Sequence, residues 1–183
     1  MATQYDIVRL ATVVSTQDAA REMMAASGRP TLVVADRQVT GRGRQGRAWV
    51  PPDRGMFASL SFVSDWDVPV RTLIPLATAV AVADSVDEMF DLRLGLRWPN
   101  DLMMSGDKVG GILVETSGDI VTVGCGLNLW WADPIEGARG LLGRDPGDSI
   151  APALAAAWVE ALVGYLEKGS EAWPREAYEE ASL

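Results

Sequence analysis

The sequence predicts an α+β fold, with a mixed, mostly antiparallel β-sheet and helices packed on one face. Three observations support this class. Hydrophobic residues make up 48% of the 183 residues, which is enough to build the core of one domain. Short β-branched segments are separated by turn residues, and two pairs of them are joined by tight-turn sequences. Segments with helical apolar spacing lie before, between and after these strands.

The N-terminal elements are a strand and a helix. Residues 6–14 are rich in β-branched side chains and predict the strand. Ser15 or Thr16 can cap the helix that follows, whose alanines and methionines favour a helix to about Ala26. Gly28 is then the predicted stop signal.

Two further strands and a long helix are predicted in the middle of the chain. Residues 31–35 and 56–63 predict the strands, and they are separated by a glycine- and arginine-rich loop at 40–47 and a turn at 51–55. Apolar residues at helical spacing over 71–90 predict the longest central helix.

The C-terminal half predicts a strand, two hairpins, a loop and two helices. The strand covers residues 92–98 and ends at a proline. The hairpin strands lie on either side of the turn sequences Ser-Gly-Asp at 105–107 and 117–119. These strands are residues 102–104, 109–115 and 120–127, followed by a loop at 133–148 and helices at 150–166 and 170–181.

The polar composition excludes several kinds of catalysis. The chain has no histidine and one cysteine, and its 16 basic residues are 14 arginines with only Lys108 and Lys168 as lysines. Ser-His-Asp and Cys-His mechanisms and a histidine-ligated zinc site are therefore excluded, and we expect no protein-bound metal site. The chemistry must use carboxylates, arginines, hydroxyls, backbone amides or a lysine.

Composition also bears on the compartment. A single cysteine, Cys125, cannot form an intramolecular disulfide, and the first ten residues lack the pattern of a secretory signal, so we expect a cytoplasmic protein. The most apolar stretch, residues 73–86, is short and contains Asp84, so it predicts a helix of a soluble protein rather than a membrane span.

The charge is unevenly distributed. The net charge is -9, which argues against nucleic acid as a partner. Residues 36–54 nevertheless contain five arginines and two aspartates, a local charge of +3. A basic island in an acidic chain indicates a site for an anionic ligand.

The centre of this island is the segment Gly41-Arg42-Gly43-Arg44-Gln45-Gly46-Arg47. Glycines let a backbone approach a ligand closely, and arginines supply planar donors that suit carboxylate and phosphate. The segment lacks the order of a P-loop. A solvated basic loop or an RNA-binding Arg-Gly segment would be the alternatives, although the latter usually repeats.

Two polar segments follow the central helix. Trp98-Pro99-Asn100-Asp101 predicts a turn at which Asn100 and Asp101 can hold a hydroxyl, a base edge or a hydrated Mg²⁺. Lys108 then precedes Gly110 and Gly111, and strand glycines often mark the close approach of a ligand. A packed turn and an ordinary exposed lysine are the alternatives.

Gly124-Cys125-Gly126-Leu127-Asn128 ends the last predicted strand. Its glycines predict that the backbone lies near the same cleft, with Asn128 at the mouth. Cys125 is predicted to be a small core residue rather than a nucleophile, because no base is available to activate it.

These segments together resemble the biotin protein ligases. The resemblance rests on four motifs that follow the order and spacing of this family. They are residues 41–49, which end at Trp49, and residues 98–101, 108–115 and 124–128. Ser15-Thr16-Gln17 resembles the family's Ser-Thr-Asn segment, and Gln38 resembles the glutamine ahead of its arginine loop. The likeness extends over about residues 6–182 and implies the catalytic-domain fold of this family, which is similar to that of class II synthetases.

The resemblance implies a two-step reaction with biotin and ATP, accompanied by Mg²⁺. Biotin's carboxylate attacks the α-phosphate of ATP, and a lysine of a biotin carboxyl carrier domain then takes the biotinyl group. By motif position, Lys108, Arg42 and Arg44 would be catalytic. The implied biotin-binding residues are Ser15, Thr16, Gln38, Gly41, Arg42, Gly43, Arg44, Trp49, Lys108 and Gly111. The implied nucleotide-binding residues are Arg42, Arg44, Arg47, Trp49, Asn100, Lys108 and Asn128.

The sequence departs from the family pattern in three places. Arg97 stands where the family usually has lysine, and Gln17 stands where it has asparagine. The third departure is that residues 1–183 are expected to form the catalytic domain alone, without an N-terminal winged-helix domain or a C-terminal SH3-like domain. We therefore expect no operator binding, no membrane partner, and an edge strand that could support a homodimer.

Two other functions remain open from the sequence. Lipoate or octanoate transfer occurs on the related fold, but those relatives carry a histidine that this chain lacks. A module that binds biotin or a carrier domain without catalysis is the second alternative.

Overall fold

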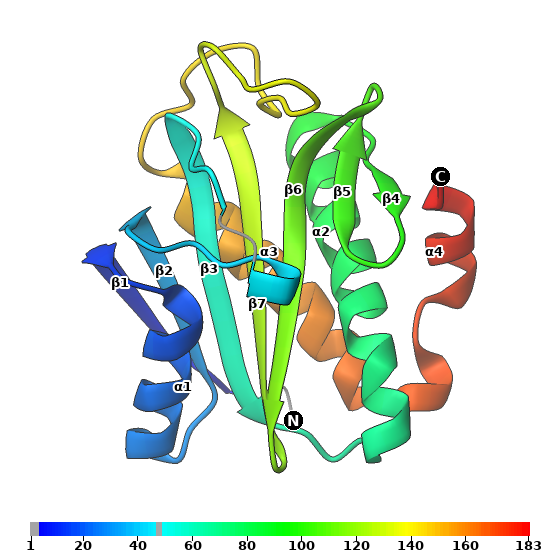
Figure 1. The fold of residues 1–183 in the computed structure, drawn as a ribbon. Coiled ribbons are helices and arrows are strands. Elements are labelled where there is room, and N and C mark those ends of the chain that lie inside the picture. The colour runs from blue at the N-terminus through cyan, green and yellow to red at the C-terminus, as the bar shows by residue number, and fades with distance from the viewer. Residues whose placement is uncertain (1–3, 47–48) are drawn as a thin grey trace.

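A single β-sheet organises the molecule. The computed structural model describes residues 4–46 and 49–183, and within them seven strands form one sheet in the order β1-β2-β3-β7-β6-β5-β4 (Figure 1). β1 and β2 are parallel and all other neighbours are antiparallel, so the predicted mixed, mostly antiparallel sheet is confirmed. The strands are β1 (Asp6–Val13), β2 (Thr31–Gln38), β3 (Arg54–Val63), β4 (Gly95–Arg97), β5 (Asp101–Met104), β6 (Asp107–Ser117) and β7 (Ile120–Trp130).

Helices lie on both faces of the sheet (Figure 1). The prediction of helices on one face holds for α2 (Ile74–Phe90) and α3 (Ile150–Glu167), which pack on the main core. α1 (Thr16–Ser27) lies on the opposite face, where Ala20 packs with Val33 in a smaller cluster. The reason is topological. A parallel pair such as β1 and β2 needs a crossover connection, α1 is that crossover, and the right-handed preference of such crossovers selects one face.

α3 is the helix that could cross a membrane by its length and composition alone. In the fold, however, Leu154, Trp158 and Leu162 of this helix are completely buried in the main core. One face of α3 therefore packs in the main core, although only 28% of the helix is buried.

Most predicted elements are present, and the differences in their bounds have local causes. β4 keeps only three of the seven residues predicted at 92–98, and these three are the residues that pair with β5. Pro174 interrupts the last predicted helix, leaving a 3-10 turn at Ser170–Ala172 and α4 (Arg175–Ala181) beside α2. The predicted hairpin at 105–107 is confirmed, with Ser105 and Gly106 at φ 53° and 91°.

Candidate functional site

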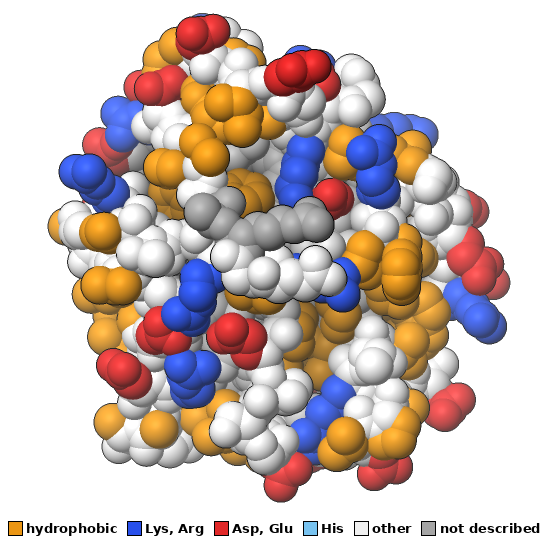
Figure 2. All heavy atoms as spheres, viewed as in Figure 1, with side chains coloured by type: hydrophobic (Ala, Val, Ile, Leu, Met, Phe, Trp, Pro, Cys, Tyr) orange, Lys and Arg blue, Asp and Glu red, His pale blue; other side chains and the backbone are white. Residues whose placement is uncertain are grey.

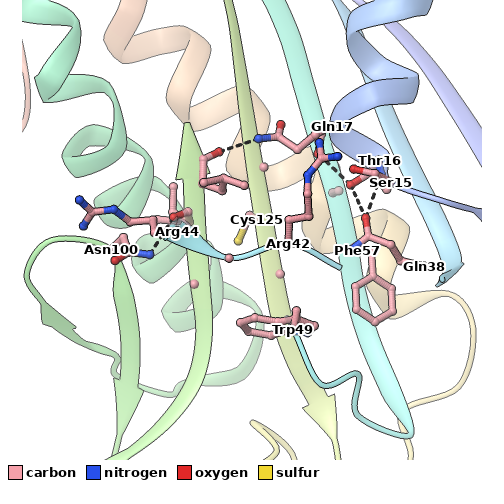
Figure 3. A pocket seen from close by; sticks show the side chains of 18 of the residues that line it. Ser15, Thr16, Gln17, Gln38, Arg42, Arg44, Trp49, Phe57, Asn100 and Cys125 are labelled. Carbon is pink, nitrogen blue, oxygen red and sulfur yellow. Dashed lines mark hydrogen bonds between the residues drawn. The ribbon is translucent and has the colours of Figure 1, made fainter. Parts of the chain in front are cut away.

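A pocket of about 380 Å³ opens on the face of the sheet that carries α1. The start of α1, the glycine- and arginine-rich loop and the turn before β5 form its walls, and strands β3, β6 and β7 form its floor (Figure 3). The side chains and glycines that matter for its chemistry are Ser15, Thr16, Gln17, Gln38, Arg42, Arg44, Trp49, Ser59, Asn100, Asp101, Lys108, Gly111, Gly124, Cys125 and Gly126. Most of the residues predicted from the motifs are thus gathered at one pocket.

One end of the pocket is polar and uncharged. Gln38 Oε1 accepts hydrogen bonds from the backbone N–H of Thr16 at 2.9 Å and from its hydroxyl at 3.0 Å, and that hydroxyl also lies 2.8 Å from Ser59 Oγ. Gln38, rather than the predicted Ser15 or Thr16 side chain, therefore caps α1. The Thr16 backbone N–H identifies the bonded atom of Gln38 as its amide oxygen, and Gln38 as a whole lines the pocket.

Gln17 is buried beside this end and joins α1 to the sheet. Its Nε2 donates to the carbonyl oxygen of Leu113 on β6 at 3.1 Å, and its Oε1 is buried without a hydrogen-bond partner among the described residues. A Cβ on Gly124 would lie 3.0 Å from Gln17 Cδ and 3.1 Å from Ser59 Oγ. Gly124 therefore provides the space that the longer glutamine needs.

The strand glycines predicted to approach a ligand have two different roles. A Cβ on Gly111 would lie 3.5 Å from the Trp49 ring, and a Cβ on Gly126 would lie 3.4 Å from it, so both glycines leave the pocket floor open to an aromatic ring. A Cβ on Gly110 would instead lie 2.7 Å from the Gly126 carbonyl oxygen and 2.7 Å from Leu127 Cδ1. Gly110 is thus required by the packing of the sheet, which corrects the expectation that both glycines of this pair serve a ligand.

The first two glycines of the loop also differ. Gly43 lines the pocket, whereas Gly41 lies behind it. The carbonyl oxygen of Gly41 accepts a hydrogen bond from the Trp49 N–H at 2.9 Å, and a Cβ on Gly41 would lie 2.8 Å from Trp49 Cβ. Gly41 therefore lets the two ends of the loop approach each other, and this places the Trp49 ring in the pocket.

The other end of the pocket carries a lysine. Lys108 Nζ donates to Asp101 Oδ1 at 2.5 Å and lies 5.7 Å from the centroid of the Trp49 ring. Both charged side chains are about one-third exposed, so the ammonium group is held in place but open to the pocket. An anion entering the pocket would meet Lys108 and would compete with Asp101 for it.

The arginines of the basic island are dispersed in the fold. Arg54 binds Asp145 and Asp148 on a distant loop, so it does not contribute to the pocket. Arg42 and Arg44 both line the pocket, but Figure 3 shows their side chains pointing apart. Arg47 lies outside the described residues. The local charge of +3 therefore does not form one continuous anion site among the residues that the structure describes.

Arg42 is already paired in this structure. Its Nη1 and Nη2 donate to the two carboxylate oxygens of Asp18, each at 2.8 Å. This pairing lowers the pKa of Asp18 below its usual range and, in the same way, raises the pKa of Arg42. Arg44, in contrast, forms no ion pair within residues 4–46 and 49–183, and it lies on the Asn100 side of the pocket (Figure 3).

The two asparagines predicted to serve a nucleotide are in different environments. Asn100 lines the pocket, and its Nδ2 donates to the carbonyl oxygen of Ile112 at 3.0 Å. Asn128 is 2% exposed, and its Nδ2 donates to the carbonyl oxygen of Arg139 at 3.2 Å. The expectation that Asn128 sits at the mouth of the pocket is wrong, because the loop after β7 covers it.

Cys125 lies in the pocket wall but is chemically quiet. It is a free, buried thiol, and burial raises its pKa to about 12. The prediction that it is a small core residue agrees with this environment. Groups of three or more cysteine, aspartate or glutamate side chains arranged to hold a metal do not occur in the described part of the chain.

Some residues at the site were not predicted. Ser59 supports Thr16 from β3, and Asp18 holds Arg42 from α1. Asp101 was predicted as a residue that could hold a hydroxyl, a base edge or a hydrated Mg²⁺, but its ion pair with Lys108 was not predicted. A signal existed for Ser59, since a serine on the buried side of an apolar strand needs a polar partner. Asp18 gave no signal, because acidic residues are common in the first turn of helices.

Comparison with known families gives one match over most of the chain. The family described as "Biotin/lipoate A/B protein ligase family" matches residues 11–128. These residues include every pocket segment described above, from the start of α1 to the end of β7's glycine-rich stretch.

Characterised relatives have related names. The chain is 34% identical over 131 residues to the biotin--[acetyl-CoA-carboxylase] ligase of Mycobacterium tuberculosis, a match that covers 69% of this chain and 49% of the relative. It is 36% identical over 123 residues to the bifunctional ligase/repressor BirA of Bacillus subtilis, covering 63% of this chain and 38% of the relative. The chain thus spans about half, or less, of the length of these relatives.

Solved structures share the fold. The biotin protein ligase of Leishmania major in complex with biotin matches with a TM-score of 0.80 at 26% identity, covering 96% of this chain and 79% of that one. The Aquifex aeolicus biotin protein ligase in complex with biotin and ATP matches with a TM-score of 0.75 at 28% identity, covering 94% and 76% of the two chains. The predicted α+β fold class is therefore confirmed.

Proposed function

Because this chain belongs to the biotin/lipoate A/B protein ligase family, we propose that it is a biotin protein ligase. In the proposed reaction, biotin and ATP give biotinyl-5'-AMP and pyrophosphate, and the biotinyl group then passes to a lysine of a biotin carboxyl carrier domain. The names of the relatives, which include a biotin--[acetyl-CoA-carboxylase] ligase, support this assignment. A related structure holds biotinyl-5-AMP, the intermediate of this reaction.

One observation carries the proposal. A single pocket combines an uncharged hydrogen-bonding end, at Thr16 and Gln38, with a cationic end, at Lys108, above a glycine floor. Biotin has a matching asymmetry, since a neutral cyclic urea lies at one end and a carboxylate at the other. We therefore orient biotin with its urea toward Gln38 and its carboxylate toward Lys108.

In the first step, a carboxylate oxygen of biotin forms a bond to the α-phosphorus of ATP, and the bond from that phosphorus to the bridging oxygen of pyrophosphate breaks. The two reactants are anions, so the main barrier is their mutual repulsion and the charge of the transition state. Lys108 would offset both, and Arg44, which has no ion-pair partner in the described part of the chain, is a second cation on the pocket wall. No general base is required, which suits a pocket without histidine.

In the second step, the neutral amine of the acceptor lysine attacks the biotinyl carbonyl carbon. An amide bond forms, the bond from that carbon to the AMP oxygen breaks, AMP leaves and the amine loses a proton to solvent.

We propose that the acceptor is the carrier domain of a biotin-dependent carboxylase and that the reaction takes place in the cytoplasm. The acidic surface supports neither nucleic acid nor a membrane as a partner. We also propose that the protein can form a homodimer through an edge strand of its sheet.

Magnesium enters this proposal as part of the substrate MgATP. Mg²⁺ keeps several waters and is usually held by substrate phosphates and one or two protein oxygens. The side chains of Asn100 and Asp101 at the pocket wall supply such oxygens, which fits this mode of binding.

The polar end favours biotin over lipoate. Thr16, Gln38 and Ser59 place amide and hydroxyl groups at this end of the pocket, and the urea of biotin can both donate and accept hydrogen bonds. The dithiolane ring of lipoate offers only weakly accepting sulfur atoms. A ligand with a urea would therefore pair with polar groups that lipoate cannot use.

The test is a reconstituted reaction. The protein is incubated with MgATP, a carrier domain and either biotin or lipoate, and pyrophosphate release and carrier modification are measured. The proposal expects both signals with biotin and neither with lipoate. Biotin binding without either signal would replace it with a non-catalytic binding module, and activity with lipoate alone would replace it with the lipoyl reaction.

A further inference from the structure

Four charged side chains form a compact cluster beside the pocket. Asp18 accepts hydrogen bonds from Arg42 at 2.8 Å and from Arg21, one helical turn away, at 2.7 Å. Glu115 Oε2 on β6 lies 3.7 Å from Arg42 and 3.6 Å from Arg21. The cluster joins α1, the sheet and the described loop residues 41–46. Figure 2 shows Lys/Arg and Asp/Glu side chains next to each other over the α1 side of this face.

This cluster leaves Arg42 little capacity for a phosphate. Both terminal nitrogens of its guanidinium are used by the two oxygens of one carboxylate. The cluster holds two positive and two negative side chains, so its formal charge is zero. An incoming phosphate would have to displace Asp18 and would then face two carboxylates, which costs electrostatic energy rather than gaining it.

The position of Asp18 links the loop to the polar end of the pocket. Asp18 directly follows Thr16 and Gln17, whose side chains are fixed by Gln38 and by the Leu113 carbonyl group. Arg42 lies between Gly41 and Gly43, so this side chain is what ties a flexible backbone to a rigid helix. The helix start and the loop are therefore held together at the point where the neutral end of a ligand would lie.

We propose that Asp18 is a positioning residue, whose two hydrogen bonds to Arg42, aided by the nearby charge of Glu115, hold loop residues 41–46 against the polar end of the pocket. Arg42 then acts as an anchor of the loop, and Lys108 and Arg44 are the cations that meet the reacting phosphate. The inference rests on the proposed function for the identity of the ligand, but the anchoring itself does not depend on it.

The experiment uses a charge swap with a matched control. The variants are Asp18→Asn, Arg42→Asp and the double variant D18R/R42D, and the control is Glu22→Gln, which makes the same carboxylate-to-amide change on an exposed residue of α1. Amide hydrogen exchange of residues 41–46 is measured without ligand. Biotin dissociation is measured by competition with excess unlabelled biotin.

The swap separates two roles of Arg42, because an anchoring pair regains function when its two charges are exchanged and a phosphate-binding arginine does not. We expect Asp18→Asn to raise both the exchange of residues 41–46 and the biotin dissociation rate by about fivefold over Glu22→Gln. The swap should recover part of both losses, with both rates at least about twofold slower than in Arg42→Asp alone. Recovery is partial because the swap restores the pair but brings a carboxylate at position 42 near Glu115 and a guanidinium at position 18 near Arg21.

Two outcomes would overturn the proposal. One is an Asp18→Asn variant that behaves like Glu22→Gln in hydrogen exchange. The other is a swap whose hydrogen exchange at residues 41–46 is no slower than that of Arg42→Asp alone, because that result shows that the charge pair does not hold the loop. If the unmodified protein does not bind biotin, the proposed function fails, and the hydrogen-exchange arm still decides whether Asp18 anchors the loop.

Discussion

Lys108 is the residue with the clearest chemical role at the pocket. Its ammonium group lies between the Asp101 carboxylate and the Trp49 ring, one-third exposed, so an anionic ligand can reach it without moving the backbone. We expect Lys108→Ala to reduce pyrophosphate formation by about 100-fold or more, because it removes a charge that stabilises the transition state. The measurement is ATP–pyrophosphate exchange in the presence of biotin, with circular dichroism as a check on the fold.

The second lysine provides the control for that prediction. Lys168 is exposed at the end of α3, and it lies 5.8 Å from the centroid of the Tyr165 ring. Lys168→Ala should leave exchange within about twofold of the unmodified protein, as surface substitutions usually do. Equal losses in the two variants would show that Lys108 has no special part in the reaction.

Cys125 on β7 allows a test of how well the pocket floor is shielded from solvent. Burial raises the pKa of its thiol to about 12, so at pH 8 only about one molecule in ten thousand carries the reactive thiolate. We expect no maleimide labelling of the folded protein at pH 8 and one label per chain in guanidinium chloride, measured by mass spectrometry. Fast labelling of the folded protein would mean that the pocket floor opens to solvent.

The sequence identifies residues whose role depends on nearby residues in the chain, and it misses residues whose partners are distant. Lys108 and Gln38 stand in recognisable motifs, and both line the pocket. Asp18 looks like an ordinary acid in the first turn of a helix, because its partner Arg42 lies 24 residues later. Asn128 was misplaced for the same reason, since the loop that covers it comes from further along the chain.

At the scale of elements, β6 carries two adjacent glycines with different purposes. Gly110→Ala should destabilise the fold by about 2 kcal/mol, because its Cβ would meet the backbone oxygen of Gly126 at 2.7 Å. Gly111→Ala meets only ordinary contacts of 3.5 Å or more, so it should change the free energy of unfolding by less than about 0.5 kcal/mol. Urea denaturation of both variants gives the comparison.

The same pair separates stability from binding. Since Gly111 lines the pocket under Trp49, Gly111→Ala should weaken biotin binding while the fold remains stable. Gly110→Ala should bind biotin normally at temperatures where it is folded, because it does not line the pocket. Similar effects of both variants on stability would contradict the division of roles between them.

Elements were predictable where their cause is local. The turns at 105–107 and 117–119 contain residues that adopt left-handed conformations, and both hairpins form as predicted. The length of β4 was not predictable from its own residues, because it depends on which of them pair with β5. The position of α1 on the opposite face follows from the parallel pairing of β1 and β2, which no local pattern reveals.

The whole molecule brings distant segments to one place. β7 lies between β3 and β6, so the glycines of β6 and β7 lie next to the serine of β3 below the loop. The order of strands depends on long-range pairing and could not be derived from the sequence, although the set of pocket residues could be inferred from motif resemblance. The net charge is -9, yet the pocket carries cations. Several arginines outside the pocket are neutralised by acidic partners, so they add little to the local charge there.

Coupling between the two substrates should appear in the stability of the whole molecule. A ligand at 100 times its Kd stabilises the folded state by about 2.7 kcal/mol, which for a domain of this size corresponds to a rise in Tm of about 5–10 °C. If biotin and MgATP react in the pocket, the product holds both binding ends in one molecule, and the joint shift in Tm should exceed the sum of the separate shifts. Differential scanning calorimetry with biotin, MgATP and both together measures this. An ATP analogue with a methylene group between the α- and β-phosphates is the control, because it can occupy the same site but cannot release pyrophosphate, so its shift with biotin should be additive. Additive shifts with ATP itself would show that both ligands bind without the joining reaction.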